Sequence, residues 1–211
     1  MKVVALNGSP RKDGNTSILI DTALKELNAH GIETQQIHVG GKQLQGCIAC
    51  MKCWETKNGQ CILKNDPLNE WLEIMRSANG IILGSPVYCA GLSAQIKAVI
   101  DRASMVACAN DDLLQRKIGA SIVAVRRAGS VHTFSSLNLF FTITQMITVG
   151  STYWNMGFGM EKGEVLKDAE GLQTMCNLAL NMAWLLESID KSKNLVTQPK
   201  VKREVLTNFI K

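Results

Sequence analysis

The first seventeen residues constrain the fold of this chain more than any other stretch. Residues 2–7 contain an unbroken apolar run, VVAL, which predicts a short buried strand. Gly8 and Pro10 end that strand, and after a polar loop the sequence NTS opens an amphipathic helix. A strand, a small-residue loop and a helix N-terminus together form an anion site in α/β proteins, because the first backbone N–H groups of the helix have no partner within it.

Polar side chains around this loop can complete a site for one phosphate group. They are the hydroxyls of Ser9, Thr16 and Ser17 and the guanidinium of Arg11. The loop has neither the GxxxxGK[ST] pattern of a P-loop nor the GxGxxG pattern of dinucleotide-binding proteins. A hydroxyl-rich loop of this kind suits a monophosphate such as that of FMN. The alternative is an ordinary strand–helix turn with a polar cap.

Apolar runs and helical spacing alternate along the rest of the chain. Strands are predicted at 32–39, 80–84 and 117–125, with a short fifth strand at 149–153, and helices at 16–29, 67–75, 93–106, 131–148 and 168–189. The alternation predicts an α/β fold with a doubly wound parallel sheet in the flavodoxin-like order 2-1-3-4-5. We expect one domain over residues 1–190, followed by a basic tail at 191–211. In this fold the loops after strands one, three and four meet at the ligand site.

The loop after the third predicted strand, SPVYCAGLS at 85–93, has features that suit a planar ring. Pro86 restricts the backbone, Gly91 permits close approach, and Tyr88 offers an aromatic face. Cys89 lies in the same loop and can contact a bound ring. The alternative is a proline-containing turn that happens to carry a tyrosine.

Two arginines, Arg126 and Arg127, follow the fourth predicted strand. Adjacent side chains at a strand end point to opposite sides of the sheet, so at most one of the two is expected to face a ligand. We assign that position to Arg126, and the alternative is a solvated pair.

A long segment at 40–66 interrupts the alternation and contains four of the seven cysteines. A stretch of this length without regular structure is expected to be functional or to be held by something. Cys47, Cys50, Cys53 and Cys61 have the spacing C-x₂-C-x₂-C-x₇-C. Compact spacing of this kind suits the four thiolates of a 4Fe–4S cluster, whereas structural zinc prefers two separated C-x₂-C pairs. Zinc and four free thiols remain alternatives.

Composition excludes several other classes of protein. The chain has 211 residues, of which 46% are hydrophobic and 19% are charged, as in ordinary globular domains. The net charge of +5 arises in residues 191–211, and residues 1–190 carry 17 basic and 17 acidic side chains. A nucleic-acid partner is therefore not expected, because it would require a basic face on the body of the domain. No apolar stretch reaches membrane-spanning length and the N-terminus enters a strand directly, so we expect a cytoplasmic protein with no membrane partner.

Four stretches together resemble the iron–sulfur flavoprotein family, in the NADPH-dependent FMN reductase-like branch of flavodoxin-like proteins. They are GSPRKDGNT at 8–16, the cysteine group at 47–61, GSPVYCAGLSAQIKAVIDR at 84–102, and RRAG with YWNMGFG within 126–159. The resemblance implies a flavodoxin-like fold that binds FMN and a 4Fe–4S cluster. It also implies homodimers or homotetramers that pass electrons from a low-potential donor such as ferredoxin to an acceptor such as oxygen, peroxide or quinone.

The resemblance assigns residues to both cofactors. By the motif match, Ser9, Arg11, Asn15, Thr16 and Ser17 hold the phosphate, Pro86, Val87, Tyr88, Cys89 and Gly91 line the ring, and Cys47, Cys50, Cys53 and Cys61 ligate the cluster. No general acid or base is predicted, because the flavin supplies the redox chemistry.

Two other functions compete with this interpretation. The first is a cluster-free reductase that takes hydride from NAD(P)H and passes it to FMN or a quinone. The second is a non-enzymatic flavodoxin-like module whose cysteine knuckle binds zinc for partner recognition.

Overall fold

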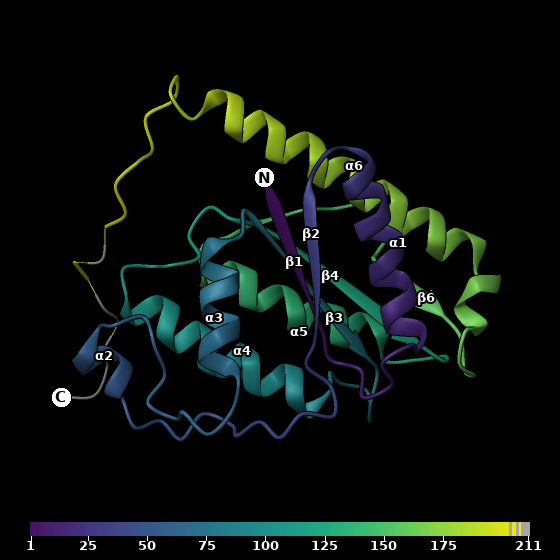
Figure 1. Cartoon of the computed structure of the whole chain (residues 1–211), viewed down its shortest axis with the longest axis horizontal. Helices are drawn as coiled ribbons and strands as arrows, with labels where there is room; N and C mark the ends of the chain where they lie inside the picture. Colours follow the sequence, from purple (N-terminus) through teal and green to yellow (C-terminus); the bar gives the residue numbers. More distant parts are fainter. Residues whose placement is uncertain (203, 206, 208–211) are drawn as a thin grey trace.

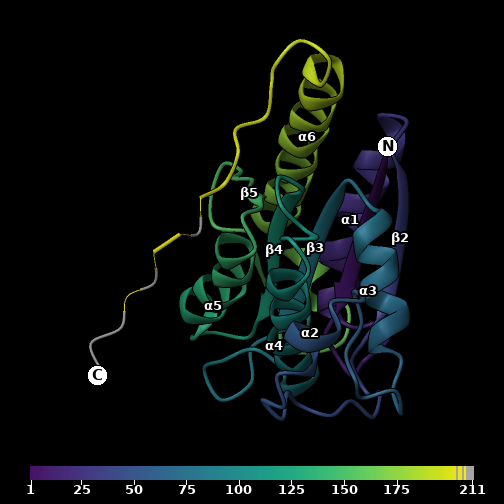
Figure 2. The same ribbon diagram turned by 90° about the vertical axis from the view of Figure 1, so that its left-hand side faces the viewer.

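A parallel sheet organises the computed structural model, which describes residues 1–202, 204–205 and 207 (Figures 1 and 2). Its strands lie in the order β2-β1-β3-β4-β5, which confirms the predicted flavodoxin-like order. They span Lys2–Asn7 (β1), Glu33–His38 (β2), Gly80–Pro86 (β3), Ile118–Val125 (β4) and Ile147–Thr148 (β5). A further short strand, β6 at Met156–Phe158, also pairs in parallel with β4. The switch point therefore lies between β1 and β3.

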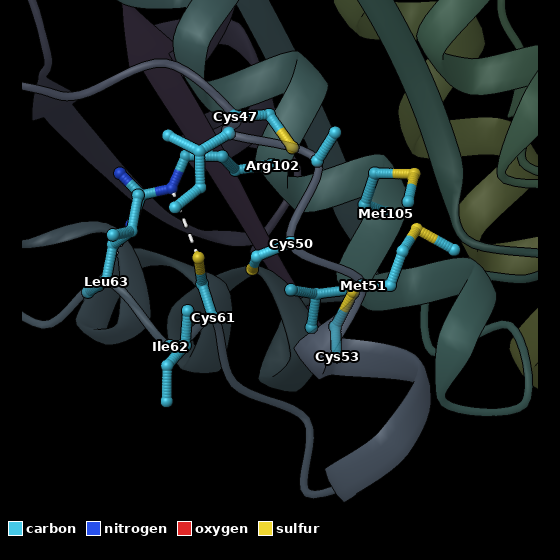
Figure 3. A pocket seen from close by; sticks show the side chains of 12 residues that line it. Cys47, Cys50, Met51, Cys53, Cys61, Ile62, Leu63, Arg102 and Met105 are labelled. Atoms are coloured by element: carbon cyan, nitrogen blue, oxygen red, sulfur yellow. Dashed lines mark hydrogen bonds between the residues drawn. The ribbon is translucent and has the colours of Figure 1, made fainter.

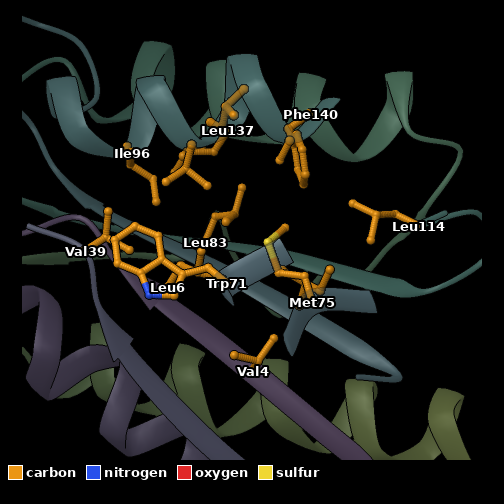
Figure 4. Packing of buried hydrophobic residues seen from close by; sticks show 14 of the residues in the cluster. Val4, Leu6, Val39, Trp71, Met75, Leu83, Ile96, Leu114, Leu137 and Phe140 are labelled. Atoms are coloured by element: carbon orange, nitrogen blue, oxygen red, sulfur yellow. The ribbon is translucent and has the colours of Figure 1, made fainter. Parts of the chain in front are cut away.

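Helices cover both faces of the sheet. One face carries α1 (Asn15–Ala29) and α6 (Ala169–Ser192), and the other carries α3 (Leu68–Ser77), α4 (Ala94–Ala109) and α5 (Ser130–Ile143). Side chains on a strand alternate between faces, so Val4 and Leu6 pack against the second set, whereas Val3 and Ala5 pack against the first. Burial on both faces explains why these strands are continuous apolar runs. Figure 4 shows the packing on the face covered by α3, α4 and α5.

The region after β4 differs from the sequence prediction. The helix expected to reach residue 148 ends at Ile143, and Gln145 adopts a left-handed conformation with φ of 57°. That turn brings Ile147 at once beside β4, where its N–H donates to the carbonyl of Lys117 at 2.9 Å. The strand expected at 149–153 is wrong, because the hydroxyl of Ser151 bonds to the carbonyl of Tyr153 and to Asn155 and so holds a turn there.

The two shortest helices are α2 at Lys52–Thr56, which lies in the cysteine segment, and the 3₁₀ helix η1 at Glu164–Lys167, whose Val165 is buried in the core beside α1 and α6. The basic tail follows α6, and its described part is largely exposed. Arg116 donates to the side chain of Gln198 and to the carbonyl of Pro199, so this part of the tail contacts the domain. Within the described residues, no helix is long and apolar enough to cross a membrane.

Candidate functional site

The loops that follow β1, β3 and β4 meet at the carboxyl ends of these strands. The N–H of Gly8 donates to the carbonyl of Gly84 at 2.8 Å, and the buried hydroxyl of Ser93 donates to the carbonyl of Gly8 at 2.7 Å. Gly129, after β4, lies so close to the β3 loop that an added Cβ would come within 2.9 Å of Val87 and Ala90. The three predicted loops therefore form one continuous surface.

Helix α1 begins on this surface without a capping side chain. Gly14 is its N-cap residue, and the first turn contains no acidic residue. The carbonyl of Gly14 accepts the first helical hydrogen bond from Ile18 at 3.1 Å. Among the described residues, the N–H groups of Asn15, Thr16 and Ser17 make no hydrogen bond. These free donors at the positive end of the helix dipole can bind an anion.

The five residues assigned to the phosphate have different surroundings. Ser9 is buried and its hydroxyl accepts from the N–H of Arg11 at 3.2 Å, whereas Arg11 itself is exposed. Thr16 is buried beside Gly84. The side chain of Asn15 instead bonds to the carbonyl of Glu161 and the N–H of Gly163, and Ser17 bonds to Gln36 and Asp21. The backbone N–H groups of Asn15 and Ser17 are therefore available to the predicted phosphate site, while their side chains bond to neighbouring segments.

Polar residues on the edge strand β2 support the loop and were not predicted. His38 lies at the end of β2, and its Nε2–H donates to the carbonyl of Ser9 at 2.7 Å. Gln36, two residues earlier and so on the same face, accepts from the side chain of Asn7 at 2.8 Å. Burial raises the pKa of Asp21, which accepts a hydrogen bond from the Gln36 amide. Alternating polar residues beside the first strand were the sequence signal for this support.

The β3 loop forms a tight turn at its tip. Tyr88 and Gly91 exchange two backbone hydrogen bonds at 2.8 and 2.9 Å, and the residues between them, Cys89 and Ala90, both have positive φ. Such φ values are uncommon for residues other than glycine, so contacts with the surrounding structure must hold this turn in place. The base of the loop is fixed by the buried hydroxyl of Ser85, which accepts from the N–H of Ser93 at 3.0 Å.

The residues of the β3 loop that are predicted to line the ring are accessible to a ligand. Tyr88 and Cys89 are exposed, and Pro86, Val87 and Gly91 are half-buried. Arg126 and Arg127 are both exposed beyond β4. The expectation that Arg126 faces the ligand therefore stays a prediction.

The four cysteines of the segment between β2 and α3 surround one small cavity (Figure 3). Left-handed turns at Ala49 and Met51 bend the chain between the first three cysteines. The backbone of Cys61 is fixed by Asn69, whose side-chain oxygen accepts from its N–H at 2.8 Å and whose amide donates to its carbonyl at 2.9 Å. The rest of the lining is mostly apolar and consists of Ile48, Ala49, Met51, Ile62, Leu63, Arg102, Met105 and Val106.

The donor set of this cavity fits an iron–sulfur cluster. All four cysteines are free thiols, and in the described part of the chain no three His, Cys, Asp or Glu side chains are grouped closely enough to hold a metal ion as they stand. A cluster takes one thiolate on each of several irons and so accepts ligands spaced around a cavity. Burial raises the pKa of the Cys53 thiol, and the nearby thiols of Cys50 and Cys47 act in the same direction against opposing backbone hydrogen bonds. A coordinated metal ion holds such thiols in the thiolate form.

A buried ion pair closes the cysteine segment. Arg102 on α4 bonds to Asp66, and both side chains are at most 6% exposed. Burial disfavours the Asp66 carboxylate, but hydrogen bonds from Arg102 and from the N–H groups of Gln45 and Leu68 outweigh it and lower its pKa.

Asp66→Asn is expected to destabilise the protein by about 3 kcal/mol, because it leaves the Arg102 charge buried without its partner. Because the pKa of Asp66 is lowered from its ordinary value of 3.8, the ionised carboxylate contributes its full stabilisation at pH values above about 3.8. This stabilisation is lost as the pH falls through the pKa of the folded state. Urea unfolding from pH 3 to pH 7 checks both effects. A variant with wild-type stability at pH 7 would contradict them, and Glu73→Gln, which removes an exposed pair with Arg76, is the matched control.

The fold and these loops define the class of protein, that of flavodoxin-like proteins. The structure is similar to the crystal structure of a flavodoxin, a WrbA-like protein from Agrobacterium tumefaciens, with a TM-score of 0.63 and 15% identity over 89% of this chain and 98% of that one. It is also similar to RosB solved with 8-demethyl-8-formylriboflavin-5′-phosphate, with a TM-score of 0.72 and 16% identity over 100% of this chain and 95% of that one. At such identities the likeness shows the fold alone.

Sequence comparison defines the family within that class. Residues 1–161 match the model of the NADPH-dependent FMN reductase family. The chain is also 38% identical to an iron–sulfur flavoprotein of Methanocaldococcus jannaschii, over 90% of this chain and 100% of the relative. The chain belongs to the NADPH-dependent FMN reductase family and, within it, to the iron–sulfur flavoproteins. Its chemistry is accordingly that of a flavin-based redox protein.

Proposed function

We propose that the protein binds FMN at the three-loop surface and a 4Fe–4S cluster in the cysteine cavity, and that it transfers electrons between them. The observation that carries the proposal is the position of both sites on one helix. Ser93, the N-cap of α4, bonds to Gly8 after β1 and to Ser85 at the end of β3, and Arg102 on the same helix bonds to Cys61. Nine residues of helix correspond to about 14 Å, so one rigid element joins the two sites.

The FMN phosphate would lie at the start of α1. The free N–H groups of residues 15–17, the hydroxyls of Ser9 and Thr16 and the guanidinium of Arg11 would hold it. The flavin ring would lie against the β3 loop, with Arg126 near its edge. The ring-loop residues in this assignment are Pro86, Val87, Tyr88, Cys89 and Gly91. FMN supplies electron transfer in one- and two-electron steps, and the protein's part is to orient the ring and exclude competing reactions.

The cluster would be ligated by Cys47, Cys50, Cys53 and Cys61. It would receive single electrons from a low-potential donor such as ferredoxin, and the flavin would pass them to oxygen, peroxide or a quinone. The apolar residues around the thiols would limit access of water to the cluster. We further propose that the functional unit is a homodimer or homotetramer.

A second candidate function follows from the description of the matched family model, which names NADPH as reductant. In this alternative NAD(P)H transfers hydride to FMN directly and the cysteine site takes no part.

Anaerobic stopped-flow measurements separate the two candidates. We expect a reduced ferredoxin to bleach the flavin at least about tenfold faster than the same concentration of NADPH, because single electrons enter through the cysteine site. The control is Cys50→Ala, which should slow reduction by ferredoxin and leave reduction by NADPH unchanged. Equal rates of reduction by ferredoxin in the two proteins would contradict the electron-transfer proposal.

A further inference from the structure

Arg102 is a buried cation that points out of the hydrophobic core and into the cysteine cavity. It is 1% exposed, and it lies on α4 among the core residues Val99, Ala103 and Val106. A charged group in such a place requires a full set of partners. Figure 3 shows its guanidinium beside the sulfur of Cys61.

The guanidinium binds four residues of the cysteine segment at once. Nη1 donates to the carbonyl of Gln45 at 3.0 Å and to the carboxylate of Asp66, and Nη2 donates to the carbonyl of Leu63 at 3.0 Å. Nε donates to Sγ of Cys61 at 3.3 Å. Gln45 precedes the first cysteine and Leu63 follows the last, so this one side chain fixes both ends of the segment.

Cys61 therefore differs from the other three cysteines. In the described part of the chain it is the one thiol of the four that accepts a hydrogen bond from a cationic side chain. Arginine stays protonated at any pH at which the protein is folded, so this hydrogen bond and its charge are constant features of the site.

We propose that Arg102 is a positioning residue for the cluster ligand Cys61 and that it raises the reduction potential of the cluster. This inference rests on the proposed function. A bound cluster would gain one electron from the reductant, and with it one unit of negative charge, without exchange of a proton or a bond. A hydrogen bond to a ligand sulfur and a nearby positive charge both stabilise the more negative, reduced state. The carboxylate of Asp66 partly neutralises that charge and so opposes the effect.

Two variants separate this role from a purely structural one. Arg102→Met with Asp66→Leu replaces the ion pair by apolar groups, a change that is often tolerated, and removes the donor to Cys61. Asp66→Asn keeps the donor and removes the neutralising charge. Iron and FMN per chain are measured first, and then the midpoint potential of each protein is measured by titration with dithionite and mediators, followed by EPR.

The expected shifts have opposite signs. The cluster potential should move to a more negative value in the double variant and to a more positive value in Asp66→Asn, while the FMN potential stays the same. Unchanged potentials, or shifts of the same sign, would overturn the proposal. Loss of iron from the FMN-loaded double variant alone also supports positioning of Cys61. Loss of iron from FMN-loaded Asp66→Asn would overturn it, because that variant keeps the bonds of Arg102 to Cys61, Gln45 and Leu63 and should therefore keep the ligand in place. A wild-type protein that binds no iron would instead overturn the proposed function.

Discussion

Cys50→Ala is expected to reduce the iron content from about four atoms per chain to below roughly one, while one FMN per chain remains bound. The four thiols surround one cavity, and removing one ligand opens the cluster to solvent and to loss of iron. The flavin should be unaffected, because the FMN loops are held by their own contacts between Gly8, Gly84 and Ser93. Iron analysis and flavin absorption of anaerobically purified protein measure both quantities.

The matched control for this variant is Cys176→Ala, a half-buried cysteine on α6 outside the cavity. It should retain iron and FMN at wild-type levels. Full retention of iron in Cys50→Ala would contradict the four-ligand assignment. Loss of FMN together with iron would show that the two sites are not independent, contrary to the contacts described above.

Gly14→Asp is expected to weaken FMN binding by at least about 100-fold. The new carboxylate would cap the free N–H groups of α1 and lie within a few ångströms of the phosphate, where repulsion between two negative charges costs about 3 kcal/mol or more at an effective dielectric constant near 20. The backbone of Gly14 is extended, with φ of −85°, so aspartate can adopt it. Titration of the apoprotein with FMN, followed by quenching of flavin fluorescence, measures the affinity.

Gly14→Asn is the matched control, because it adds a capping side chain of the same size without the charge. Both variants should be at least as stable to heat as the wild type, since each supplies the missing cap. An added Cβ would lie 3.0 Å from the Cβ of Arg11, so Arg11 must shift slightly in both. Equal FMN affinity in the aspartate and asparagine variants would contradict the placement of the phosphate at this helix start.

The central strands and the loops after them were predictable because the residues that determine them are adjacent in the sequence. Continuous apolar runs at β1, β3 and β4 require burial on both faces, and glycine or proline marks the turn at the end of each run. The short strands after α5 were not predictable in this way. β5 has two residues, and its position depends on the left-handed turn at Gln145 and on pairing with β4.

The contacts that support the two sites could not be read from the sequence, because they join distant residues. Arg102 is 41 positions from Cys61 and 57 from Gln45, and His38 is 29 positions from Ser9. A charge among the core-facing positions of α4 was the one local sign that Arg102 has a partner inside the protein. The cysteine spacing indicated a ligand set, and the fold supplied the cation beside it.

Anaerobic purification followed by quantitation of FMN, iron, sulfide and zinc shows whether one chain carries both a flavin and an iron–sulfur cluster. We expect one FMN with about four irons and about four sulfides per chain, and no zinc. FMN without iron would contradict the cluster and leave the NAD(P)H-dependent reductase, and zinc without FMN would contradict both redox functions.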